Sequence, residues 1–145
     1  MRYFKFLFAS FILLISTGCA SLDCKPTTSK ALPGTDTAVV GLYIDKNGYP
    51  QANIDTVRVF PGQKIVFVGP EKFEIFFKNQ SSPIDNFEAR TSNGILTIEI
   101  PKDIFEREQR KQRAATANEL KEIIYRYGIK ANGKVTDPTI IVDRR

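Results

Sequence analysis

The sequence predicts an all-β Greek-key sandwich of seven or eight strands, and three observations lead to that fold class. From residue 38 onward, short apolar runs alternate with turn residues. Several of these runs alternate apolar and polar residues with a period of two, as strands with one buried face do. The chain has 145 residues, of which 42% are hydrophobic, and this is enough for the core of one domain.

Residues 1–18 are predicted to be a signal peptide. A basic start with Arg2 and Lys5 precedes a largely apolar run over 6–15, which is too short to span a membrane. The "STGC" segment that follows resembles a bacterial lipobox, although Ser16 stands where that pattern prefers an aliphatic residue. The resemblance implies lipidation of the Cys19 thiol. Cleavage by ordinary signal peptidase after "GCA" and an uncleaved anchor are the alternatives.

A lipidated Cys19 implies stable attachment to the cell envelope. Ala20 follows it, and by the sorting rule of enteric bacteria this implies the outer membrane, facing the periplasm. Cleavage before Cys19 would remove two of the 21 basic residues and leave 19 against 16 acidic ones. That small excess, in this compartment, predicts no nucleic-acid partner. Cys24 is then expected to be an exposed free thiol, with a disulfide to a partner as the alternative.

Residues 19–37 are rich in Ser, Thr, Pro and Gly and show no apolar period, which is typical of a flexible tether. The folded domain is therefore expected over 38–145. Its first strand is "AVVGLYID", and "KNGYP" supplies an Asn-Gly pair for a tight hairpin turn.

The next strands are "DTVRVF", "KIVFV" and "FEIFF". In the last of these, Phe73, Ile75 and Phe77 share one face because strand side chains alternate. Phe76 lies on the opposite, mostly polar face. Packing against the following loop is the ordinary interpretation of Phe76, and a ligand-facing aromatic is the alternative.

A long loop is expected over 79–94, followed by the strand "ILTIEIP" and one helical excursion near 102–121. The four-residue spacing from Asp103 to Arg107 supports the helix. Its basic run comprises Arg107, Arg110, Lys111 and Arg113. This run is either a solvated helix face balanced by nearby Glu residues or a contact with an anionic envelope component or an acidic protein partner. Loop 79–94 is a second candidate for recognition.

The chain ends in a predicted hairpin, "EIIYRYGIKA" and "VTDPTIIVD", around an Asn-Gly turn. The inward residues of its first strand are expected to be Ile123, Tyr125, Tyr127 and Ile129. Pro138 has no amide hydrogen, so the second strand lies at an edge or enters the sheet only after this residue.

The order of "VRVFPGQKIVFV", "FEIFFKN", "GILTIEIP", "YRYGI" and "TIIV" over residues 38–143 resembles the cupredoxin-like family. In that family a Cys thiolate, two imidazoles and usually an axial thioether hold copper. By resemblance, the thiolate position falls on Ile129. The chain has no His, and its single Met is Met1. The copper site is therefore expected to be absent, with Ile129 filling the space.

Other active-site chemistries are disfavoured as well. Without His there is no imidazole base, and the Glu residues of the domain show no facing pair. The sequence thus predicts a non-enzymatic, cofactor-free binding or assembly module with an unknown envelope partner. One alternative is a periplasmic inhibitor or accessory subunit of an envelope enzyme. Another is a carbohydrate-binding or sugar-active protein that uses Phe76, Tyr43 and Tyr49.

Overall fold

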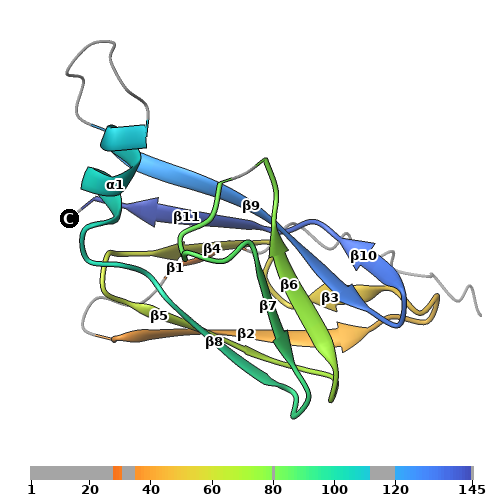
Figure 1. Cartoon of the computed structure of the whole chain (residues 1–145). Coiled ribbons are helices and arrows are strands. Elements are labelled where there is room, and N and C mark those ends of the chain that lie inside the picture. The colour runs from red at the N-terminus through yellow and green to blue at the C-terminus, as the bar shows by residue number, and fades with distance from the viewer. Residues whose placement is uncertain (1–27, 31–34, 80, 112–119, 145) are drawn as a thin grey trace, which may run out of the picture.

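The computed structural model describes residues 28–30, 35–79, 81–111 and 120–144, with two β-sheets and one helix (Figure 1). The larger sheet has the order β1-β4-β11-β9-β6-β7, and β10 pairs with β9. The smaller sheet has the order β3-β2-β5-β8. The predicted all-β sandwich is confirmed.

The strands of the larger sheet are β1 (Thr28–Lys30), β4 (Thr56–Val59), β6 (Phe73–Phe77), β7 (Glu88–Thr91), β9 (Glu122–Ala131), β10 (Lys134–Thr136) and β11 (Thr139–Asp143). Those of the smaller sheet are β2 (Thr37–Ile44), β3 (Pro50–Ala52), β5 (Lys64–Val68) and β8 (Ile95–Glu99). The helix is α1 (Ile104–Lys111). The strands longer than three residues agree with the seven or eight expected, while β1, β3 and β10 are three-residue additions.

The core lies between the sheets and is built by the alternating residues of each strand. In β6, Phe73, Ile75 and Phe77 are buried as predicted. The same holds for the predicted inward residues of β9, which are Ile123, Tyr125, Tyr127 and Ile129. The ring centroids of Tyr127 and Phe67 are 5.6 Å apart in an edge-to-face arrangement, so the two sheets meet through aromatic contacts.

Turn residues set the register of the hairpins. Asn132 and Gly133 both have positive φ, 52° and 75°, which is the geometry that Asn-Gly favours in a two-residue hairpin turn. At the other Asn-Gly pair, Asp45 and Tyr49 close the turn between β2 and β3 through a 2.9 Å backbone hydrogen bond. β11 begins at Thr139, directly after Pro138, as the missing amide hydrogen of proline requires.

Two segments differ from the sequence-based expectation. Part of predicted loop 79–94 forms β7, which pairs antiparallel with β6. β7 contributes little to the core, so its "EART" sequence has no apolar alternation to reveal it. Within predicted tether 19–37, β1 pairs parallel with β4, and Thr37 already belongs to β2. The chain is therefore hydrogen-bonded to the domain before residue 38.

The predicted helical excursion over 102–121 is described up to Lys111 as α1. Residues 112–119, and with them Arg113, lie outside the described residues, as do the predicted signal peptide 1–18, Cys19 and Cys24. No helix in the described part of the chain is long and apolar enough to cross a membrane.

Candidate functional site

A groove of about 490 Å³ lies between α1 and the loop that connects β6 to β7. The loop supplies Ser82, Pro83, Ile84, Asp85 and Phe87, and the helix supplies Ile104, Arg107, Arg110 and Lys111. The sequence singled out the basic helix and the loop as separate candidates for recognition. The structure brings them together around one space.

The loop wall is held in place by its own hydrogen bonds. The buried Ser82 hydroxyl donates to the carbonyl of Asn86 at 2.9 Å and accepts from the amide of Ile84 at 3.2 Å. The amide of Phe77, the last residue of β6, donates to the carbonyl of Phe87 at 2.8 Å. These bonds hold the backbone around Ile84 and Phe87 in one conformation, so the apolar side of the groove is preformed.

The helix wall is fastened to the core by one face of α1. Ile104 and Phe105 are buried, and so is the carboxylate-bearing Glu108. The Tyr125 hydroxyl of β9 lies 3.3 Å from Glu108 Oε1, and Lys111 Nζ donates to the same oxygen at 2.8 Å. Burial, followed by the Glu108 carboxylate, raises the pKa of Tyr125. The phenol therefore stays protonated at neutral pH and can donate to Glu108.

The basic face of α1 is only partly neutralised. Arg107 Nε donates to both Asp103 oxygens, at 2.9 and 3.0 Å, and its Nη1 lies 3.1 Å from Asp85 Oδ1. The hydrogen bond from Arg107 holds the pKa of Asp103 below its usual value, and Asp103 in turn raises the pKa of Arg107. Arg110 has one ion-pair contact in the described residues, at 3.9 Å from Asp103, and 72% of its side chain is exposed.

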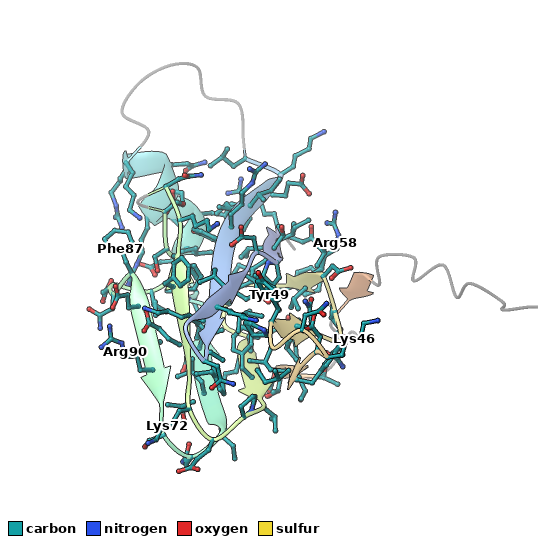
Figure 2. All side chains as sticks on the ribbon, turned by 90° about the vertical axis from the view of Figure 1, so that its right-hand side faces the viewer. Lys46, Tyr49, Arg58, Lys72, Phe87 and Arg90 are labelled. Atoms are coloured by element: carbon teal, nitrogen blue, oxygen red, sulfur yellow. The ribbon has the colours of Figure 1, made fainter. Side chains whose placement is uncertain are left out.

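Within the described part of the chain, the charges that line the groove are three cations and one carboxylate. Arg107, Arg110 and Lys111 face the groove from α1, and Asp85 is the carboxylate. Arg110 has the weakest counter-ion of the three, so it is the cation most available to a ligand. The groove combines this charge with an apolar wall of Pro83, Ile84 and Phe87. Phe87 is 49% exposed and lies near α1 (Figure 2).

Phe76 does not belong to this groove in the described structure. It stands opposite Gly128 of β9 in the strand register, and an added Cβ at Gly128 would lie 2.2 Å from the Phe76 ring. The ring thus covers the glycine on the outer face of the larger sheet, which resembles the aromatic rescue seen at glycines in sheets. Phe76 is half-buried in this position, with Gly128 of the neighbouring strand β9 as a contact.

The three aromatic residues considered for sugar binding are not brought together. Phe76 faces outward from the larger sheet, because its neighbours Ile75 and Phe77 are buried. Tyr43 faces outward from the smaller sheet, with 53% of its surface exposed. The outer faces of a sandwich point in opposite directions. Tyr49 stacks with the ammonium of Lys134, 4.4 Å from the ring centroid.

The position expected to replace a copper ligand is part of the core. Ile129 is fully buried and pairs with Ile75 across β9 and β6. A mononuclear copper site of this type needs imidazole and thiolate ligands, and the chain has no His, while its only Cys residues are Cys19 and Cys24. In the described part of the chain, no group of three His, Cys, Asp or Glu residues could hold a metal ion. The residues present therefore do not fit the copper centre of that family.

No protein-family model matches the sequence, and no curated protein matches it. Among solved structures, the chain is similar to a copper-binding protein whose apo form was determined by NMR in solution. The sequence identity is 14%, the match covers 82% of this chain and 100% of that chain, and the TM-score is 0.43.

Proposed function

We propose that this protein is a membrane-anchored envelope lipoprotein whose β-sandwich acts as a non-enzymatic binding or assembly module. One observation carries the proposal: loop and helix, two surfaces of different chemistry and distant in sequence, converge on one preformed groove. Binding sites commonly lie on loops held by a rigid scaffold. The anchor in this proposal is a lipid on Cys19, and the compartment is the periplasmic side of the outer membrane.

We also propose that the domain is a metal-free relative of the cupredoxin-like family. Support comes from the order of strand motifs over 38–143 and from the full burial of Ile129 where that family has its thiolate ligand. An inhibitor or accessory subunit of an envelope enzyme would use the same groove, so it is a special case of the binding role. The sugar-binding alternative is weaker, because two of its aromatic residues, Phe76 and Tyr43, face outward from opposite sheets.

Site-specific photo-crosslinking in intact cells tests the binding role. A photoreactive phenylalanine analogue replaces Phe87 in the groove, and in a matched variant it replaces Tyr43, which is similarly exposed but on the smaller sheet. We expect a protein adduct from position 87 only. Arg110→Glu should abolish it, whereas Arg126→Glu, the same charge change on an exposed strand position, should not. Absence of an adduct at position 87, or equal adducts at both positions, would contradict the proposal.

A further inference from the structure

We propose that the groove binds an acidic peptide segment of a partner protein, in which an aromatic or aliphatic side chain stands next to a carboxylate. This inference rests on the proposed binding role and names the chemistry of its ligand. It follows from the size of the groove, the distribution of charge along α1 and the direction in which the chain enters the domain.

The groove has room for one large side chain. A volume of about 490 Å³ lies at the lower end of the range for ligand sites. Pro83, Ile84 and Phe87 provide apolar surface on the loop side, and Ile104 lies at the base of the helix side. Phe87 is a half-exposed aromatic residue beside this groove, and aromatic residues are enriched in protein interfaces.

The basic half offers one available guanidinium. Arg107 already bonds Asp103 and Asp85, and Lys111 bonds Glu108. Among the residues that the structure describes, Arg110 has one ion-pair contact, the 3.9 Å contact with Asp103. A guanidinium binds a carboxylate through two parallel hydrogen bonds. Arg110 can therefore bind one carboxylate of a peptide, while the apolar side chain next to that carboxylate in the peptide enters the apolar part of the groove.

The same arrangement fits a phosphorylated membrane lipid less well. A doubly charged phosphate is matched by several free cations, whereas two of the three here have carboxylate partners at 3.1 Å or less. The direction in which the chain enters the domain also disfavours a membrane lipid as the ligand. β1 runs parallel to β4, and the turn after β4 bonds to Ile100, just before α1. The start of β1 at Thr28 therefore lies at the end of the sandwich away from α1. If the lipid anchor precedes Thr28, the groove lies at the end of the domain opposite the attachment point. This placement favours a protein partner over the membrane to which the protein is attached.

The test measures fluorescence anisotropy of three labelled peptides with the full-length chain in zwitterionic detergent. The acidic peptide is Gly-Asp-Phe-Glu-Asp-Gly, the neutral one is Gly-Asn-Phe-Gln-Asn-Gly, and the third, Gly-Asp-Gly-Glu-Asp-Gly, lacks the aromatic side chain. We expect the acidic Phe peptide to bind most tightly, and its Kd to rise with salt. Arg110→Glu should raise this Kd about tenfold or more, because it places like charges together. Phe87→Ala should raise it about fivefold or more, and the matched control Arg126→Glu should leave it unchanged.

Three results would overturn the inference. The first is equal or tighter binding of the neutral peptide. The second is an Arg126→Glu effect as large as that of Arg110→Glu. The third is the absence of binding by the acidic Phe peptide; Arg110-dependent binding of the Cys19→Ser chain to vesicles that contain phosphatidic acid, whose phosphate monoester carries up to two charges, would then identify a lipid phosphate as the ligand. If position 87 still crosslinks to a protein partner when any of these results is found, the binding role is retained and only the acidic-peptide chemistry is excluded. Loss of that crosslink would remove the binding role itself.

Discussion

Arg107 joins the two walls of the groove: its Nη1 atom lies 3.1 Å from Oδ1 of Asp85, across 22 residues of sequence. The Asp85 side chain is 92% exposed. Ion pairs in such exposed positions add little to stability. The carboxylate does, however, reduce the positive charge of the groove. The ion pair between Arg107 and Asp85 is therefore expected to affect ligand binding more than the stability of the fold.

Asp85→Asn is therefore expected to leave the unfolding midpoint in urea close to that of the wild type. In the peptide assay it should lower the Kd of the acidic Phe peptide, because it removes a repulsive charge beside the site. Glu71→Gln neutralises an exposed carboxylate elsewhere and is the matched control. Weaker binding of the acidic peptide by Asp85→Asn would mean that this carboxylate organises the groove rather than opposing the ligand.

Gly128→Ala should destabilise the domain by about 1–3 kcal/mol, as overpacking does. The new Cβ would lie 2.2 Å from the Phe76 ring, which must move. In a Phe76→Ala background the same change should be nearly neutral, because the space is open. Gly41→Ala is the control, since its Cβ would meet Asn53 at an ordinary 3.4 Å. Equal losses with and without Phe76, in urea unfolding, would show that the ring does not limit this position.

Local patterns in the sequence predicted much of the fold. The period-two alternation identified the buried faces of β6 and β9, the Asn-Gly pairs identified two hairpins, and Pro138 marked the start of β11. Each of these signals depends on neighbouring residues alone. β7 was missed because it buries little apolar surface, and β1 because its pairing with β4 is a long-range contact.

The groove could be predicted only in parts. The basic run in the sequence indicates Arg107, Arg110 and Lys111, and the Pro and Gly content of residues 79–94 indicates the loop. Their convergence depends on how α1 docks through Ile104 and Phe105 onto the sandwich, which no local pattern encodes. Alternation along "FEIFF" places Phe76 on the polar face, but the contact of its ring with Gly128 depends on the β6–β9 register.

Ile129→Ala should lower the free energy of unfolding by about 2–5 kcal/mol, since it empties space in a fully buried position. Ile129→Val should cost only about 0.5–1.5 kcal/mol. Val135→Ala, at a position that is 40% exposed, is the control and should be close to neutral. Urea unfolding measures all three. A small effect at Ile129 would mean that this part of the core is not closely packed.

Cys19→Ser should remove incorporation of a labelled fatty acid and release the protein from the membrane fraction. A thiol at this position is the acceptor in the lipobox that "STGC" resembles. Cys24→Ser is the matched control and should retain both label and fractionation. Retention of label in the Cys19→Ser chain would contradict lipidation at this residue.

Tyr127→Phe and Tyr125→Phe should have opposite effects, although both tyrosines are fully buried. The Tyr127 hydroxyl has no hydrogen-bond partner among the described residues, and an unpaired buried hydroxyl is costly, so its removal should raise the free energy of unfolding by up to about 1 kcal/mol. The Tyr125 hydroxyl donates to Glu108, so its removal should cost about 0.5–1.5 kcal/mol.

The pH dependence of the free energy of unfolding provides an independent test of the burial of Tyr125 and Tyr127. Burial raises the pKa of Tyr127, with a further contribution from Asp55, and it raises the pKa of Tyr125. In the unfolded chain both phenols have a pKa of about 10. Above that pH the unfolded state releases protons that the folded state retains, so stability is full below about pH 10 and falls as the pH rises further. Urea unfolding between pH 8 and 11 should show this fall, and Tyr127→Phe should reduce its slope. An unchanged slope would mean that Tyr127 ionises as readily in the folded protein as in the unfolded chain.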